Sequence, residues 1–259
     1  MATFLFEETV FGPVKSRRLG VSLGINVLPN DAKVCNYDCI YCECGWNTDF
    51  RNHKIVLPTV EEVKTALDTR LKEMLANNEP IDAITFAGNG EPTLHPNFEE
   101  IVEVVYDLKE AHYPDAKIAI LTNGTQIKRL NSSRIFPKVD QWILKLDVGN
   151  DHHFNLINKP VSNMQLKDLV TAFVNFDGEI VIQSLFLKGD YKGESVNNMG
   201  EKDIAVWLDF LKQINPKSVM IYSLDRDTPA PNLEKASTEE LNAIAEKVKG
   251  IGLICNVYD

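Results

Sequence analysis

The chain has 259 residues, of which 44% are hydrophobic, and this is enough for one sizeable core in a single domain of residues 1–259. Its 27 lysines and arginines against 37 aspartates and glutamates give a formal charge of −10, which disfavours the extended phosphate-binding surface of a nucleic-acid-binding protein. No apolar run approaches the roughly 20 residues of a membrane span, and the N-terminus lacks the basic leader and long apolar core of a secretory signal, so we expect a cytoplasmic protein that does not enter a membrane.

Short β-branched runs alternate with longer segments of helical period, which is typical of repeated βα units on a parallel sheet. Strands are expected at 21–28, 83–88, 116–123, 139–147, 179–187 and 217–224. Helices are expected at 58–78, 97–113, 126–136, 163–176, 201–215 and 238–250, and a short apolar tail follows at 252–257. Thr59 with Glu62, and Ser237 with Glu240, have the spacing of capping boxes. Six units are fewer than the eight of a closed barrel, so we expect an α/β fold with a partial (β/α)6 barrel of parallel strands, open on one side.

In parallel α/β folds, ligands bind in the loops beyond the carboxyl ends of the strands. The loop after the first expected strand carries four of the five cysteines of the chain. The loops after the next three strands read GNGEPTLHP at 88–96, TNGTQ at 122–126 and LDVGNDHH at 146–153. All four loops should therefore lie together at the C-terminal rim, where we expect the ligand.

Cys35, Cys39 and Cys42 have the spacing C-x3-C-x2-C, and three thiolates from one compact loop suit a cubane of iron and sulfide. Cys44 lies one residue beyond Cys42, too near to reach a separate corner of the cubane easily. Cys255 lies at the far end of the chain in an apolar segment, which favours a small buried side chain. Three protein ligands would leave one iron with an open position, and an open metal position is where chemistry takes place.

Two other interpretations stay open at this point. A zinc site could use all four cysteines of the loop, or three of them with His53, and would make the chain a zinc-stabilised α/β binding module. Zinc sites, however, normally combine two separated pairs of ligands. A cluster closed by a fourth protein ligand would instead make the chain a non-catalytic iron–sulfur electron-transfer protein.

The cysteine loop, with Tyr41 before its last spaced cysteine, resembles the cluster loop of the radical S-adenosylmethionine (SAM) enzymes. The words FGPVKSRRLGVSLGINVLP, GNGEPTLHP and LKLDVGND followed by NKP resemble, more narrowly, the branch related to the tRNA wyosine-base synthases. The resemblance covers nearly the whole chain. It implies a catalytic [4Fe-4S] cluster on Cys35, Cys39 and Cys42, reductive cleavage of SAM to a 5'-deoxyadenosyl radical, and abstraction of hydrogen from a substrate.

The resemblance also implies residues that bind SAM. GNGEP resembles the methionine-binding GGEP motif, in which Glu91 would accept from the SAM ammonium group, although a plain strand-to-helix turn fits these residues too. Lys145, where the family commonly has serine, could pair with the SAM carboxylate, and Asp147 could accept from ribose hydroxyls. The further candidates each fit a turn or a structural hydrogen bond as well: Tyr41, Gly88, Asn89, Gly90, Asn123, Gln183, Ser184 and Tyr222.

Such an enzyme needs an external one-electron donor, which by analogy with the family is a flavodoxin or a ferredoxin. The narrower motifs suggest a tRNA base as substrate, but the charge of −10 weighs against RNA, and a small molecule or a peptide stays open. The densest basic segment is KSRRLG, 15–20. This segment could touch phosphate, help to bind SAM or seal the edge of the barrel.

Overall fold

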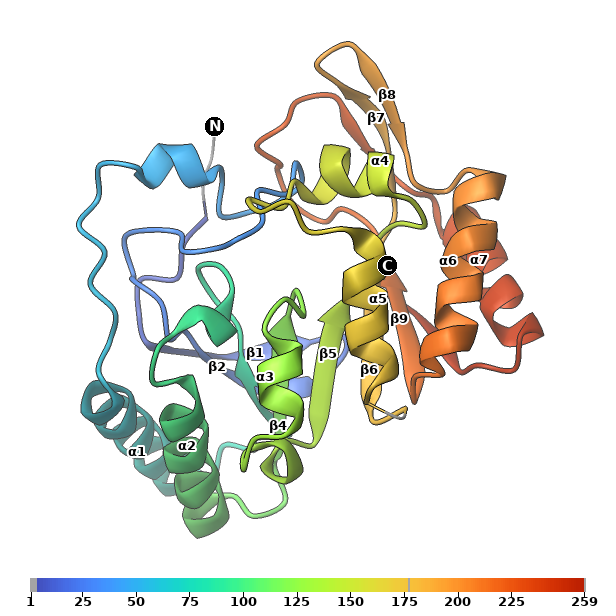
Figure 1. The fold of residues 1–259 in the computed structure, drawn as a ribbon. Coiled ribbons are helices and arrows are strands. Elements are labelled where there is room, and N and C mark those ends of the chain that lie inside the picture. The colour runs from blue at the N-terminus through green and yellow to red at the C-terminus, as the bar shows by residue number, and fades with distance from the viewer. Residues whose placement is uncertain (1–3, 177, 259) are drawn as a thin grey trace.

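The computed structural model describes residues 4–176 and 178–258, and its centre is a curled eight-stranded sheet (Figure 1). The strands are neighbours in the order β1-β2-β3-β4-β5-β6-β9-β11; β1 is antiparallel to β2, and the other pairs are parallel. The six expected strands are confirmed, and with them the partial barrel. The strands of this sheet are Val10–Ser16 (β1), Gly20–Ile25 (β2), Ala83–Phe86 (β3), Lys117–Thr122 (β4), Gln141–Lys145 (β5), Ile180–Leu185 (β6), Ser218–Tyr222 (β9) and Cys255–Tyr258 (β11).

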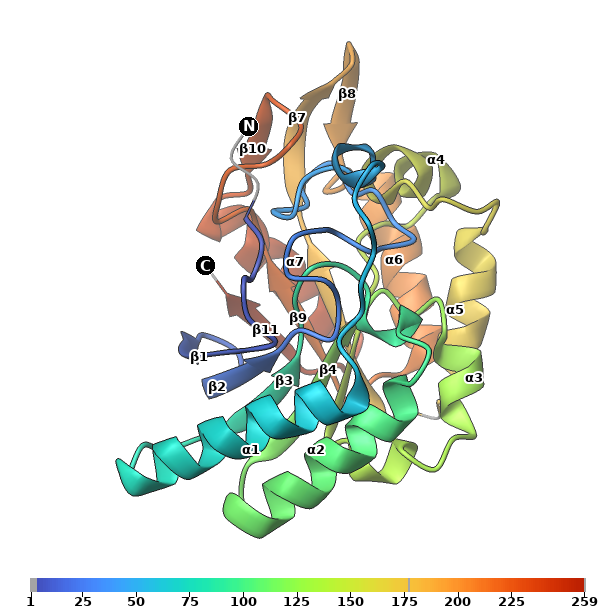
Figure 2. The ribbon, with the colours of Figure 1, turned by 90° about the vertical axis from the view of Figure 1, so that its left-hand side faces the viewer.

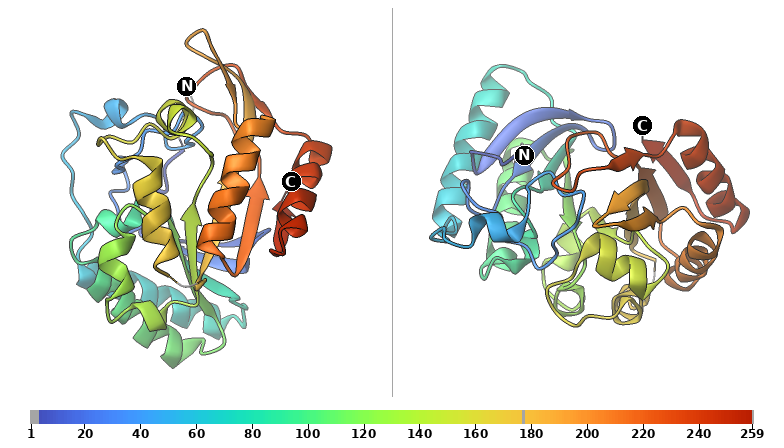
Figure 3. Two further views of the ribbon diagram at one scale, coloured as in Figure 1. Left: turned by 45° about the vertical axis from the view of Figure 1, so that its right-hand side comes forward. Right: turned by 90° about the horizontal axis from the view of Figure 1, so that it is seen from above.

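Two strands extend the sheet beyond the six-stranded expectation, one at each edge. β1 contains Gly12 and Pro13, which interrupt a strand pattern, yet it pairs with β2 across a tight turn at 17–19. β11 is only four residues long and lies in the segment expected to be an apolar tail. Viewed from above, these two ends of the sheet face each other across the open side of the barrel (Figure 3).

Helices cover the convex face of the sheet, and α1 and α2 lie side by side on it (Figure 2). Both expected capping boxes are confirmed: at the start of α1, Thr59 Oγ1 accepts from the amide of Glu62, and Ser237 does the same with Glu240 at α7. The longer helices are Val60–Ala76 (α1), Phe98–His112 (α2), Leu166–Val174 (α5), Glu201–Ile214 (α6) and Thr238–Gly250 (α7). The short ones are Asn47–Phe50 (η1), Pro92–Leu94 (η2), Ile127–Asn131 (α3), Phe136–Lys138 (η3), Asp151–His153 (α4) and Phe154–Asn158 (η4).

Two expected elements are broken in the structure. The helix expected at 126–136 is wrong in length, because α3 ends at Asn131, before two serines that favour turns over helix interiors. The strand expected at 179–187 ends with β6, and the chain then enters a second sheet of Leu187–Tyr191 (β7), Glu194–Asn197 (β8) and Leu233–Lys235 (β10). The side chain of Asn198 fixes this break, since it accepts from Leu187 N at 2.9 Å and donates to Leu185 O at 2.7 Å.

The sheet is buried on both faces, which explains why its strands read as continuous apolar runs. The helix-covered convex face carries the larger core, in which Trp207 of α6 packs edge-on against Phe186 and donates to the carbonyl of Leu146 at 3.0 Å. The concave face carries a smaller cluster of Ala119, Ile143, Val181 and Met220. Among the described residues, no helix has both the length and the apolar character that a membrane crossing requires.

Trp207 offers a test of this packing. Trp207→Phe should keep most of the buried ring but lose the hydrogen bond to Leu146 O, at a cost of about 1 kcal/mol of unfolding free energy. Trp207→Ala should cost about 3–5 kcal/mol, because it leaves a large cavity beneath β5 and β6. Urea unfolding measures both losses: a Trp207→Phe variant as stable as the unchanged protein would contradict the assigned hydrogen bond, and equal losses in the two variants would contradict the packing of the ring.

Candidate functional site

The cysteine loop is held against the GNGEP loop by the main chain. Val34 N donates to Asn89 O, and Glu91 N donates to Val34 O, each at 2.9 Å. Gly90 permits this approach, because a Cβ atom there would lie 1.9 Å from Val34 O and because its φ of +132° disfavours L side chains. Gly88 is restricted in the same way by Asn26, whose Oδ1 would lie 2.4 Å from an added Cβ. Both glycines of the motif therefore have a steric reason in the fold.

The other side of the cysteine loop is held by the segment 157–161. Ile40 N donates to Ile157 O, and Asp38 N donates to Lys159 O, each at 3.0 Å. Tyr37 and Pro160 form an antiparallel bridge. The loop that carries the cysteines is thus clamped between the rim of β3 and the rim of β5, above the C-terminal ends of the parallel strands.

The structure brings Cys35, Cys39 and Cys42 together on this loop as free thiols, with Cys39 buried and the other two half-buried. No three Cys, His, Asp or Glu side chains in the described part of the chain converge on a point suited to one metal ion. Zinc needs sulfurs about 2.3 Å from a single ion, whereas a cubane takes its thiolates at separate corners. Three thiols on one compact loop are a donor set that an iron–sulfur cluster can use.

A buried lysine lies among these thiols. Lys33 Nζ donates to Gly45 O at 2.8 Å and lies 3.5 Å from Asp38 Oδ1, with 1% of its side chain exposed. Burial opposes its charge, but the charges of the three spaced cysteines outweigh burial and raise the pKa of Lys33. A hydrogen bond from the Cys44 thiol, together with the charge of Lys33, lowers the pKa of Cys42 to about 6. Burial raises the pKa of Cys35 above its usual range and that of Cys39 to about 11, so Cys42 is the one of the three that the loop itself holds toward the thiolate, the form that binds metal.

Glu91 and Asn123 lie next to Cys35. Glu91 is 2% exposed, and its Oε1 accepts from the hydroxyls of Thr93 at 2.5 Å and Thr122 at 2.7 Å. Its Oε2 accepts from Asn123 N at 2.6 Å. Burial raises the pKa of Glu91 even though these donors favour the carboxylate. Asn123 Nδ2 lies 4.0 Å from Cys35 Sγ, so both residues that the sequence singled out stand at the thiol group.

A second polar group lies beside Cys39. Asp147 accepts from the Tyr41 hydroxyl and from Asn158 Nδ2, the latter at 2.7 Å, and lies 3.6 Å from Lys145 Nζ. Lys145 Nζ also donates to Tyr222 Oη at 3.1 Å. Burial opposes the charge of Lys145, but Asp147 and then Tyr222 raise its pKa above the ordinary value. The structure thus assembles four candidates from three different rims: Tyr41, Lys145, Asp147 and Tyr222.

The remaining candidates differ in where their side chains lie. Gln183 is aligned with Lys145 in the sheet and shares its concave face. Ser184 has the opposite parity, and its hydroxyl donates to the carbonyl of Leu146, which favours the structural hydrogen bond that the sequence left open. Asn89 is fully buried, and its side-chain amide donates to Phe6 O at 2.9 Å and Pro29 O at 2.8 Å, so it ties down the N-terminal segment.

Sequence reasoning missed two residues of this site, Lys33 and Asn158. Asn158 Nδ2 lies 3.7 Å from Cys39 Sγ and donates to the Tyr41 hydroxyl at 3.1 Å. It opens the NKP word that carried the family resemblance, and this was the only signal for it. Lys33 lies two residues before Cys35, but a lysine in a loop is normally solvated, so nothing in its sequence position indicated burial.

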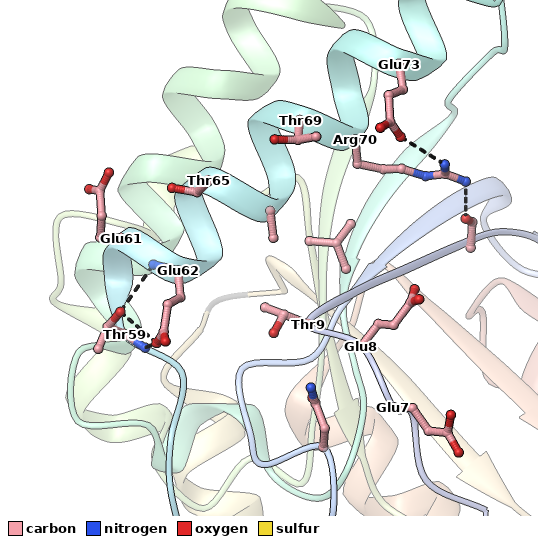
Figure 4. Close-up of a pocket in the computed structure, with 14 residues that line it drawn as sticks. Glu7, Glu8, Thr9, Thr59, Glu61, Glu62, Thr65, Thr69, Arg70 and Glu73 are labelled. Carbon is pink, nitrogen blue, oxygen red and sulfur yellow. Dashed lines mark hydrogen bonds and ion pairs between the residues drawn. The ribbon is translucent and has the colours of Figure 1, made fainter.

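A recess lies between α1 and the segment before β1, away from the cysteines (Figure 4). It has a volume of about 1070 Å³ and separates α1 from the segment that leads into β1. Five glutamates line it, namely Glu7, Glu8, Glu61, Glu62 and Glu73, and Arg70 spans it by donating to Gly12 O at 2.7 Å. Because no thiol lies there, size alone does not identify the reactive centre.

Comparison with known proteins places this site in a family. A UPF0026 protein of Helicobacter pylori is 33% identical over 231 residues, which cover 87% of this chain and 70% of that protein. An S-adenosylmethionine-dependent nucleotide dehydratase of Selenomonas ruminantium is 33% identical over 118 residues, 45% of this chain and 36% of that protein. The chain spans 32% and 60% of the length of two further curated relatives.

The fold is also found in solved structures. A radical SAM methyltransferase of Sphaerobacter thermophilus superposes with a TM-score of 0.69 at 15% identity, over 92% of this chain and 65% of that one. Identity this low shows a shared fold and no more. The model of the Radical SAM superfamily, however, matches residues 30–197, which include the three spaced cysteines and both loops that clamp them, so the chain belongs to the radical SAM superfamily.

Proposed function

We propose that this radical SAM enzyme holds a [4Fe-4S] cluster on Cys35, Cys39 and Cys42 and binds SAM across the C-terminal rim. The observation that carries the proposal is that two polar groups reach the free thiols of the loop: Asn123, bonded to Glu91, lies beside Cys35, and Asn158, bonded to Asp147, lies beside Cys39. When bound, the cluster supplies the electron for reductive cleavage of SAM. The chain's own residues have to orient SAM and exclude water.

Two charged residues suit the two ends of the methionine part of SAM. Oε2 of Glu91 accepts a hydrogen bond from Asn123 N, and a carboxylate oxygen can accept a second, here from the SAM ammonium group. Lys145 keeps its charge in the site and would pair with the SAM carboxylate. Asp147 would then accept from the ribose hydroxyls, for which its hydrogen bonds to Tyr41 and Asn158 fix its orientation.

For the substrate, we propose a molecule that carries a base or a nucleotide. The narrower motif resemblance points to a tRNA base, and the Selenomonas ruminantium relative is named a nucleotide dehydratase. The charge of −10 favours the smaller of the two, because a long polyanion would meet a surface of its own sign. The electron would come from an external donor, for which a flavodoxin or a ferredoxin is proposed by family analogy.

Cysteine variants test the ligand set. After anaerobic reconstitution the protein should be brown and contain roughly four irons and four sulfides per chain. Cys35→Ala, Cys39→Ala and Cys42→Ala should each lose the colour and most of the iron. Cys44→Ala and Cys255→Ala are the matched controls and should keep both. If Cys44→Ala bleaches as fully as the others, the ligand set is wrong, and a colourless zinc-loaded protein would support the binding-module alternative.

Cofactor turnover tests the catalytic proposal. With dithionite and SAM, the reconstituted protein should release 5'-deoxyadenosine, which chromatography measures. Glu91→Gln should weaken SAM binding about tenfold or more, because it removes the charge that faces the ammonium group. Glu99→Gln, in a surface pair with Arg129, should leave the affinity unchanged. If the spectrum of the cluster does not change when SAM is added and no 5'-deoxyadenosine is formed, the chain would instead be an electron-transfer protein.

A further inference from the structure

A recess of about 280 Å³ lies where the turn of the β1–β2 hairpin meets the rim of β9. The two edge strands of the open barrel, β1 and β11, are seen from above in Figure 3. Tyr41 and Tyr222, which belong to the candidate site, form part of the wall of the recess. Four basic side chains line it, in a protein whose formal charge is −10: Lys15, Arg17, Arg18 and Arg226.

The hairpin turn holds Arg18 in this recess. Ser16 Oγ accepts from the amides of Arg18 and Leu19, both at 3.2 Å, and this fixes the turn. Leu19 packs against the apolar cluster on the concave face of the sheet. With Leu19 anchored there, the guanidinium of Arg18 lies over the ring of Tyr222, 4.9 Å from its centroid.

Arg18 has a buried donor with nothing to bind. Its Nη1 is shielded from solvent and has no hydrogen-bond partner among the described residues. Buried donors normally have partners, and an unsatisfied one costs about 1–3 kcal/mol. If the turn served only to seal the barrel, the ring of Tyr222 would supply contact but the donor would still be unmet. The unmet donor is one observation that favours a ligand at this turn.

The charges around the recess do not balance. Arg17 pairs with Asp225 at 3.0 Å, and Arg226 pairs with Glu43 at 2.7 Å, both at the surface. No carboxylate of the described residues pairs with Arg18 or Lys15, so four basic side chains face two acidic ones. The Tyr222 hydroxyl beside this recess accepts from a further basic side chain, Lys145. The recess is thus suited to an anion with two negative charges.

We propose that this recess binds the phosphate group of the substrate, and that the substrate is a phosphate-bearing small molecule. The inference rests on the proposed function, since Tyr41 joins the recess to the cysteine loop and sets the reach from phosphate to reactive centre. Arg18 is the principal ligand, because a guanidinium donates two parallel hydrogen bonds to phosphate oxygens. An RNA strand is disfavoured, since it would need cations along the surface beyond this recess.

Binding of inorganic pyrophosphate to the cluster-loaded protein tests the proposal, with equilibrium dialysis at fixed salt as the measurement. Arg18→Gln should weaken binding about tenfold or more. Arg226→Gln should weaken it as well, and since half of that side chain is exposed, folding is not at issue. Arg134→Gln, which removes an exposed arginine paired with Glu103, is the matched control and should bind pyrophosphate like the unchanged protein.

Three outcomes would overturn the proposal: no binding by the unchanged protein, equal affinity in the Arg18→Gln and Arg134→Gln variants, or loss of SAM affinity in place of pyrophosphate affinity in Arg18→Gln. A single-stranded 20-nucleotide RNA serves as competitor, and Arg18-dependent binding tighter than that of pyrophosphate would assign the recess to RNA. The iron content of each variant separates this proposal from the previous one. If Arg18→Gln retains its iron and its affinity for pyrophosphate is unaltered, the phosphate subsite alone is refuted. If the unchanged protein contains no iron, the cluster is refuted.

Discussion

The site depends on the close main-chain approach of two loops that leave adjacent strands. Val34, in the cysteine loop after β2, pairs with Gly90, in the loop after β3, as if the sheet continued one step past its strands. Any side chain at position 90 would collide with Val34 O. The same contact that fixes the cysteines also fixes Glu91, whose amide donates to Val34. The thiols and the carboxylate therefore form one rigid unit.

Charge is the second constraint, since the rim gathers acidic groups in a buried place. The three thiols, Glu91 and Asp147 would repel one another as anions, and burying them costs free energy unless cations or donors compensate. Lys33 lies among the thiols and Lys145 beside Asp147, and both are held in the charged form. The basic recess around Arg18 continues this pattern outward, but there the compensating anion is not part of the chain.

The family and the local geometry support different parts of the interpretation. Membership of the radical SAM superfamily supports the proposed SAM-dependent radical chemistry, and a fold shared at 15% identity cannot name a substrate. The rim itself supplies the local geometry: Lys145 donates to Tyr222, Asn158 lies against Cys39, and the hairpin turn carries Arg18 to Tyr222. We expect substrate choice to depend on such contacts at the rim, that of Arg18 among them.

The sequence by itself determined the features that depend on neighbours along the chain. These features are the spacing of Cys35, Cys39 and Cys42, the capping boxes of α1 and α7, and the alternation of strands and helices. The six inner strands were predictable because apolar runs signal burial on both faces.

Only the tertiary structure decided the rest. The edge strands β1 and β11 form because a partner strand supplies their hydrogen bonds, and the break after β6 is fixed by Asn198 from elsewhere. Ser184 and Gln183 are adjacent in sequence but lie on opposite faces, and Arg18 reaches Tyr222 only because the curl of the sheet brings the β1–β2 turn to the rim of β9. Such contacts join residues far apart in the chain, so no local pattern encodes them.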